Sequence, residues 1–153
     1  RTTIFDYWGL KSLQAWANHG KFDGAGLDEE QQTLRAFYRQ LLRIARSEKA
    51  ITQGDMYDLT YAQGEGFNKH EQYAYIRKYK KHTILVVLNF DDRQVDTQVR
   101  IPQDAFEYLK LEEESLAKAE DLLTGTEYTF PLHPHTPICL TIPAWKGVIL
   151  KIK

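Results

Sequence analysis

The stretch Ile84-Leu85-Val86-Val87-Leu88-Asn89-Phe90 is a continuous apolar run that does not alternate with polar residues. Runs of this kind are typical of a strand at the centre of a β-structure, where both faces of the sheet are covered. Polar residues at 80–83 and 91–94 flank the run and predict turns. We therefore expect residues 84–90 to form the central strand of a sandwich core.

Shorter patterned segments around this strand predict one antiparallel β-sandwich over residues 55–153. In the preceding segment, aromatic and basic residues alternate with small apolar residues, so Tyr73, Tyr75, Arg77 and Tyr79 share one face of a half-buried strand. The remaining expected elements are strands at 55–62, 95–101, 121–124, 127–130, 138–142 and 148–152, a short helix at 102–109, and an acidic connector at 110–119.

Residues 28–46 predict a long amphipathic helix. Asp28 and Gln31 have the spacing at which two side chains satisfy free backbone N–H groups at a helix start. The apolar face comprises Leu34, Phe37, Tyr38, Leu41, Leu42, Ile44 and Ala45, and the opposite, basic face comprises Arg35, Arg39, Arg43 and Arg46. So wide an apolar face is typical of a helix that packs on something larger than the strands that follow, and we expect the chain to be part of a longer protein.

Composition excludes several classes of function. The 153-residue chain is 42% hydrophobic, and its twenty Lys and Arg residues balance twenty-one Asp and Glu residues. This balance argues against nucleic-acid and anionic-membrane partners, and no apolar run reaches the roughly eighteen residues of a membrane span. The single cysteine, Cys139, cannot form an internal disulfide, and its apolar surroundings predict burial. Nothing in the sequence indicates the cellular compartment.

Three small motifs are read as structural. The loop with Gly24 and Gly26 has no preceding strand and no following Lys-Ser/Thr pair, so we interpret it as a connector and expect no nucleotide cofactor. His133 and His135 have no third ligand nearby in the sequence, and we expect no metal. Asp91-Asp92 is interpreted as a hairpin turn instead of a catalytic pair.

Two groups of motifs resemble the alpha-amylase family, glycoside hydrolase family 13. The first group is similar to the end of that family's catalytic barrel and consists of RTTIFDYW (1–8), KFDG (21–24) and LRAFY (34–38). The second group is similar, in order, to the family's C-terminal β-sandwich, domain C, and consists of ILVVLNF (84–90), DLLTG (121–125) and IPAWKGVIL (142–150).

The resemblance implies that residues 1–54 are the terminal loop and helices of a catalytic (β/α)8 barrel and that residues 55–153 are domain C. It implies an enzyme acting on α-glucans such as starch and maltooligosaccharides. In that family a nucleophilic Asp and an acid/base Glu lie about 5 Å apart at the ends of barrel strands. No motif here matches those that carry them. We therefore assign no catalytic residue and expect this segment to stabilise the barrel, its partner.

The resemblance also assigns candidate substrate contacts. Asp6, Tyr7 and Trp8 would follow the last barrel strand, where loops line the active-site mouth, so they are candidates for sugar contact, and plain packing is the alternative. A second function class stays open, in which the sandwich is a non-catalytic carbohydrate-binding module that stacks sugars on Tyr73, Tyr75 or an exposed Trp. The alternative interpretation of the tyrosines is that they cover a sheet face. Trp145 is expected to cap the sandwich or to pack against the barrel.

Overall fold

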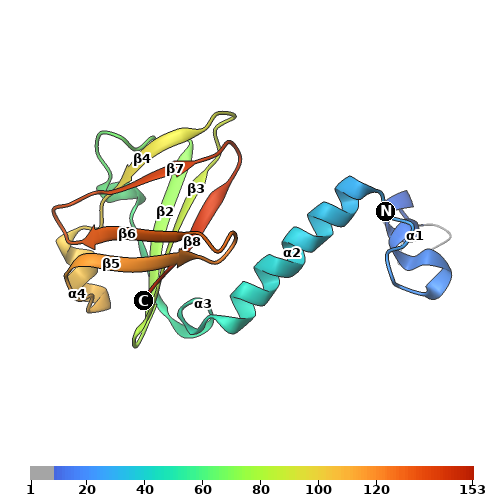
Figure 1. Cartoon of the computed structure of the whole chain (residues 1–153), viewed down its shortest axis with the longest axis horizontal. Coiled ribbons are helices and arrows are strands. Elements are labelled where there is room, and N and C mark those ends of the chain that lie inside the picture. The colour runs from blue at the N-terminus through green and yellow to red at the C-terminus, as the bar shows by residue number, and fades with distance from the viewer. Residues whose placement is uncertain (1–8) are drawn as a thin grey trace. The chain divides into compact units, whose positions relative to one another are not determined.

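The structure of the chain is a computed structural model that describes residues 9–153 (Figure 1). It contains two compact units, the first ending at Arg43 and the second running from Ile44 to Lys153. The boundary between them falls within helix α2 (Glu29–Ser47). In the described part of the chain, no helix is long and apolar enough to cross a membrane.

The first unit contains helix α1 (Lys11–Ala17), the 3-10 turn η2 (Asn18–Gly20) and most of α2. The start of α2 has the predicted pair of cap interactions. The N–H of Gln31 donates to Oδ1 of Asp28 at 2.8 Å, and the N–H of Asp28 donates to Oε1 of Gln31 at 3.3 Å. Two donors that would lack partners at a helix start are satisfied in this way, and the predicted helix is confirmed.

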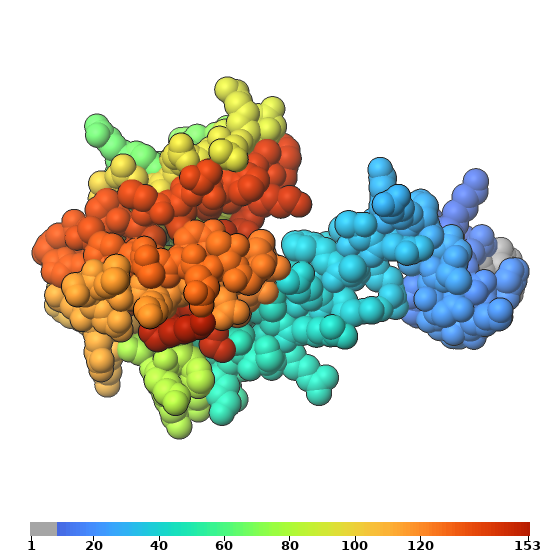
Figure 2. Space-filling view, in the orientation of Figure 1, coloured from blue at the N-terminus to red at the C-terminus, as the bar shows by residue number. Residues whose placement is uncertain are grey.

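The second unit is an antiparallel β-sandwich, which confirms the predicted fold class. Its larger sheet has six strands in the order β1-β2-β3-β8-β5-β6, and its smaller sheet pairs β4 with β7. The strands are β1 (Asp55–Asp58), β2 (Gln72–Tyr79), β3 (His82–Asn89), β4 (Val95–Val99), β5 (Glu114–Asp121), β6 (Glu127–Leu132), β7 (Ile138–Ile142) and β8 (Gly147–Ile152). The helical elements are α3 (Lys49–Gln53), η3 (Thr60–Ala62) and α4 (Gln103–Leu109). The β5–β6 hairpin and β7 form much of the face turned to the viewer in Figure 2.

Strand β3 lies inside the larger sheet, between β2 and β8. Its central residue Leu85 is opposite Ile76 on one side and Leu150 on the other. The four consecutive residues Ile84 to Val87 are each at most 4% exposed. Both faces of this strand are therefore covered, as its unbroken apolar sequence predicts.

Two expected elements are wrong, and the strand expected at 55–62 ends at Asp58 and is followed by the turn η3. The segment 110–119 is not a connector, because its second half belongs to β5, where Ala117 and Ala119 are buried and alternate with charged residues. Alanine is too small to mark a buried strand face clearly in a sequence. The strand expected at 121–124 is instead a turn that follows Asp121 and leads into β6.

Cys139 is exposed, which contradicts the expected burial. It lies in β7, where burial alternates along the strand, and Ile138, Leu140 and Ile142 occupy the inward positions. A strand of the two-stranded sheet is covered on only one face. The residues between the buried ones therefore point outward, even where the sequence is apolar throughout.

Asp121 is the polar anchor of the turn between β5 and β6. It is 1% exposed. Its Oδ1 accepts the N–H groups of Leu123 at 3.2 Å and Ile149 at 3.0 Å, and its Oδ2 accepts the hydroxyl of Thr124 at 2.7 Å. Because Ile149 belongs to β8, one buried carboxylate holds both the turn and the neighbouring strand.

We expect Asp121→Ala to lower the free energy of unfolding by about 2 to 4 kcal/mol, because buried donors lose their acceptor. Urea unfolding followed by circular dichroism measures this difference. The control is Asp96→Ala, which removes a carboxylate that accepts the Thr141 hydroxyl at 2.6 Å at an exposed site. Equal effects of the two substitutions would contradict the role given to Asp121.

Candidate functional site

The outer face of the six-stranded sheet, which points away from the two-stranded sheet, is the candidate functional surface of the second unit. Alternation along β3 directs Ile84, Val86 and Leu88 to this face, whereas Leu85 and Val87 point into the sandwich core. Ile84 and Val86 are nevertheless buried, because Ala50 of α3 packs on them. The members of this outer-face cluster that stay partly exposed are Ile51, Tyr75, Leu88, Leu122 and Ile149.

Arg77 fixes α3 on this face. Its Nε donates to the carbonyl oxygen of Ala50 at 2.9 Å, and its Nη2 donates to that of Gly54 at 2.6 Å. The carbonyl of Gly54 directly follows α3, where a helix leaves acceptors without intrahelical partners, whereas Ala50 is the second residue of the helix. A side chain at position 54 would collide with the carbonyl oxygens of Ala50 and Lys78, so glycine permits the close approach of α3 to β2.

An ion pair holds the other end of α3. Glu48, directly before the helix, accepts a hydrogen bond from Nζ of Lys151 on β8 at 2.9 Å. Both side chains are largely shielded from solvent, so salt weakens this contact less than it weakens a surface pair. Together, Arg77 and the Glu48–Lys151 pair attach α3 to two different strands of the sheet.

The predicted row of tyrosines lies on the outer face of β2 and is half-buried. The ring centroids of Tyr73 and Tyr75 are 5.7 Å apart, and the rings are inclined by 42°. Burial raises the pKa of both hydroxyls, and the charge of Asp58 adds to this effect at Tyr73. Half-buried, inclined rings fit the covering of a sheet face better than they fit a flat platform for sugars.

Trp145 does not cap the sandwich. It lies in the turn between β7 and β8, is 67% exposed and has a φ of 55°. Its backbone N–H donates to the carbonyl oxygen of Asp91 at 3.1 Å, which links this turn to the turn after β3. Packing of Trp145 against a barrel stays a prediction.

His133 and His135 lie together, with ring centroids 5.5 Å apart. Nδ1 of His133 accepts the N–H of His135 at 3.2 Å, and Nε2 lies 3.1 Å from Oε2 of Glu113. The fold brings in Glu113 although sequence spacing did not predict it. Over residues 9–153, no group of three or more His, Cys, Asp or Glu side chains is placed to hold a metal ion.

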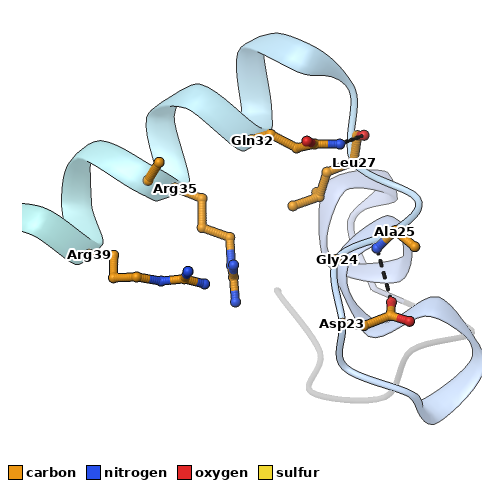
Figure 3. Close-up of a pocket in the computed structure, with 8 residues that line it drawn as sticks. Asp23, Gly24, Ala25, Leu27, Gln32, Arg35 and Arg39 are labelled. Atoms are coloured by element: carbon orange, nitrogen blue, oxygen red, sulfur yellow. Dashed lines mark hydrogen bonds between the residues drawn. The ribbon is translucent and has the colours of Figure 1, made fainter.

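A hollow of about 310 Å³ lies in the first unit, between α2 and the loop that precedes it; Figure 3 shows the residues that line it. Arg35 and Arg39 extend from α2, and Asp23 lies on the loop. Oδ1 of Asp23 accepts the N–H of Ala25 and the side-chain amide of Asn18, both at 2.9 Å, and these bonds lower the pKa of Asp23. Asp23, the one carboxylate among the described lining residues, therefore holds the loop, and the hollow contains no carboxylate pair.

The candidate sugar contacts Asp6, Tyr7 and Trp8 lie outside the described residues, and their assignment stays a prediction. Sequence reasoning did not identify α3 or its attachments. A five-residue helix is too short for a periodic signal, and Glu48 is 103 residues away from Lys151 in the sequence. Gly54 and the alternating position of Arg77 in β2 are the signals that the sequence does contain.

Residues 67–153 match a family model described as the C-terminal all-beta domain of alpha amylase. This match confirms the resemblance of the second half of the chain. Among the curated protein sequences, none matches.

Solved structures share the fold at low identity. The structure of AmyP in complex with maltose has a TM-score of 0.61 and 14% identity, covering 86% of this chain and 23% of that chain. An alpha-amylase from Anoxybacillus has a TM-score of 0.58 and 13% identity, covering 87% of this chain and 25% of that chain. Alpha-galactosidase I from Mortierella vinacea has a TM-score of 0.54 and 13% identity, covering 85% of this chain and 30% of that chain. The chain thus spans between 23% and 30% of these proteins, and the similarity shows the fold alone.

We expect Arg77→Ala to detach α3 and to lower the free energy of unfolding by about 2 to 3 kcal/mol, because two charge-assisted hydrogen bonds are lost. Hydrogen exchange should accelerate at the amides of residues 50–53. The control is Arg93→Ala, since Arg93 is a mostly exposed side chain beside Asp92. Unchanged exchange in α3 of the Arg77 variant would contradict this attachment.

Proposed function

The chain belongs to the family of alpha-amylase C-terminal all-beta domains, and we propose on this premise that it supports the catalytic barrel of a glycoside hydrolase acting on α-glucans. In this proposal α2 is a barrel helix, residues 1–54 end the barrel, and the sandwich stabilises it. The partners are the remainder of the barrel and, through the enzyme, starch or maltooligosaccharides.

The apolar face of α2 carries the proposal. Leu34, Phe37, Tyr38 and Leu42 are between 43% and 69% exposed in the structure. Contiguous apolar surface of this kind marks an interface, because leaving it in water forfeits the free energy of burial. A parallel barrel covers its outer helices on this side, and the basic residues on the opposite side of α2 suit contact with solvent.

The substrate class is supported by family membership and by AmyP, whose structure contains maltose. The fold does not select the substrate, because an alpha-galactosidase shares it. The specific preference for starch or maltooligosaccharides therefore rests on the sequence resemblance.

The geometry favours the supporting role over a binding module built on the outer-face tyrosines. Tyr73 and Tyr75 would have to present open, coplanar rings to stack on sugars, whereas they are half-buried and inclined. The contact of Tyr75 with the outer-face cluster suits a surface that is completed by packing.

We expect the 153-residue chain alone to release no reducing sugar from starch, because a retaining glycosidase needs two positioned carboxylates about 5 Å apart. A reducing-sugar assay on the purified chain measures this. Sustained activity that disappears when one carboxylate of this chain is replaced would contradict the proposal.

The helix face gives a second test, in a longer enzyme that carries this chain behind a barrel. Leu42→Glu should lower the free energy of unfolding of that enzyme by at least about 2 kcal/mol, because a buried apolar side chain is replaced by a charge. In the 153-residue chain the same substitution should have little effect, since Leu42 is 69% exposed there.

The matched control is Arg43→Glu, an exposed position on the basic face of the same helix. Thermal unfolding of both proteins with both substitutions provides the comparison. If Leu42→Glu lowers the unfolding temperature of the longer enzyme no more than Arg43→Glu does, α2 does not pack on the barrel through its apolar face.

A further inference from the structure

Two arginines of α2 extend into the hollow whose lining residues Figure 3 shows. Arg35 and Arg39 are four residues apart on the helix, and their guanidinium groups lie between α2 and the loop that precedes it. Arg35 is half-buried, whereas the other arginines of the basic face, Arg39, Arg43 and Arg46, are exposed. Arg35 is therefore the arginine of α2 that is withdrawn furthest from water. We call this feature the arginine hollow.

Neither guanidinium group in the arginine hollow has an acidic partner. Within residues 9–153, no ion pair and no side-chain hydrogen bond involves Arg35 or Arg39. Asp23 also lines the hollow, but its Oδ1 accepts the N–H of Ala25 and the side-chain amide of Asn18. A charge that is partly withdrawn from water and has no partner is unfavourable, so an anion in the hollow would stabilise Arg35.

The loop opposite α2 has no free backbone donors to offer a ligand at its glycines. The N–H of Gly24 donates to the carbonyl oxygen of Trp16 at 3.1 Å, and the N–H of Gly26 donates to that of Ala15 at 3.2 Å. The N–H of Leu27 donates to the carbonyl oxygen of Gly24 at 3.1 Å. The loop therefore does not cradle an anion as a nucleotide-binding loop does, and the arginines are the donors that the hollow provides.

The loop nevertheless forms a wall of fixed shape. A Cβ atom at Gly26 would stand 2.7 Å from the carbonyl oxygen of Ala15, so glycine permits the close approach of the loop to α1. Nε2 of Gln32 donates to the carbonyl oxygen of Leu27 at 2.8 Å and attaches the loop to α2. A wall that is already in place loses little conformational entropy when a ligand binds.

The number and type of the donors suit a phosphate group. A guanidinium group donates two parallel hydrogen bonds, and one such fork satisfies both oxygens of a carboxylate. A phosphate monoester has three acceptor oxygens and a charge of about −1.5 to −2 at neutral pH, so it can accept bonds from two forks. The hollow of about 310 Å³ is at the lower end of the range for small-molecule pockets, about 300 to 1,000 Å³. It therefore has room for more than the phosphate group alone.

Contact with water explains the other arginines of α2 but not Arg35. Arg43 and Arg46 are exposed and do not line the hollow, so their charged ends keep their hydration. Arg35 and Arg39 belong to the basic face of α2, opposite the apolar face. The hollow would therefore stay open to solvent when the apolar face packs on a barrel.

We propose that Arg35 and Arg39 bind the phosphate group of a small molecule in the arginine hollow, either free phosphate or a phosphate monoester. This site goes beyond the proposed function, because it requires neither a barrel nor an α-glucan.

The test is a titration of the ¹⁵N-labelled 153-residue chain at constant ionic strength, with inorganic phosphate in one series and glycerol 3-phosphate in another. We expect saturable chemical-shift changes at the amides of residues 23–27 and at the Nε–H groups of Arg35 and Arg39. The ligand with the lower Kd identifies the source of the phosphate group. Arg35→Gln and Arg39→Gln should each raise the Kd by at least about tenfold, because a charged donor is lost. Arg35→Lys should also raise it, since lysine keeps the charge but lacks the fork.

Arg43→Gln is the matched control, because Arg43 is exposed on the same face of α2 and does not line the hollow. Its Kd should equal that of the unchanged chain. Since Arg39 is exposed, Arg39→Gln tests the site even if Arg35→Gln fails to fold. Absence of saturable shifts would overturn the proposal. A Kd that Arg43→Gln raises as much as Arg39→Gln would also overturn it, because binding would then belong to the basic face in general.

A parallel titration with succinate tests the choice of phosphate. If succinate binds as tightly as the phosphate compounds, the assignment to phosphate is overturned. Failure of the phosphate titrations would leave the proposed function standing, because the packing of α2 on a barrel is tested separately by the substitution at Leu42.

Discussion

The structure depends on a strand that is buried on both of its faces. Successive side chains of a strand point to opposite faces, so the apolar sequence of β3 requires a cover on each side of the sheet. On one side Leu85 and Val87 belong to the sandwich core. On the other side Ile84 and Val86 are covered by α3, a helix that precedes the sheet in sequence. The sandwich therefore cannot satisfy its own central strand with strands alone.

This requirement explains why polar side chains gather around α3. Arg77 donates to the carbonyl oxygens of Ala50 and Gly54, and the Glu48–Lys151 pair attaches the beginning of the helix to β8. The cover is still incomplete, because Tyr75, Leu88 and Ile149 stay partly exposed around it. An apolar face that α3 covers only in part is consistent with a domain that completes its packing on a larger protein.

The sequence predicted the features that depend on strong local patterns. The unbroken run 84–90 indicated the doubly covered strand, and the spacing of Asp28 and Gln31 indicated the start of α2. Strand β5 was missed because its inward residues, Ala117 and Ala119, are small and stand among charged residues.

Features set by tertiary contacts could not be predicted from local patterns. Cys139 is exposed because the two-stranded sheet leaves one face of β7 open, which an apolar run alone does not indicate. The ring contacts of Tyr57 with Tyr61 and Tyr108 join three elements that are separated in the sequence, so no spacing rule identifies them. For the same reason the attachment of α3 by Lys151 became visible only in the structure.

The most direct measurement compares the urea unfolding of two fragments, residues 44–153 and residues 55–153. The first retains α3 and the second lacks it, while both contain every strand. If the outer cover of β3 is essential, residues 44–153 should unfold in one cooperative transition, and residues 55–153 should be less stable by at least about 2 kcal/mol, because Ile84 and Val86 become exposed. Equal stability of the two fragments would contradict the account.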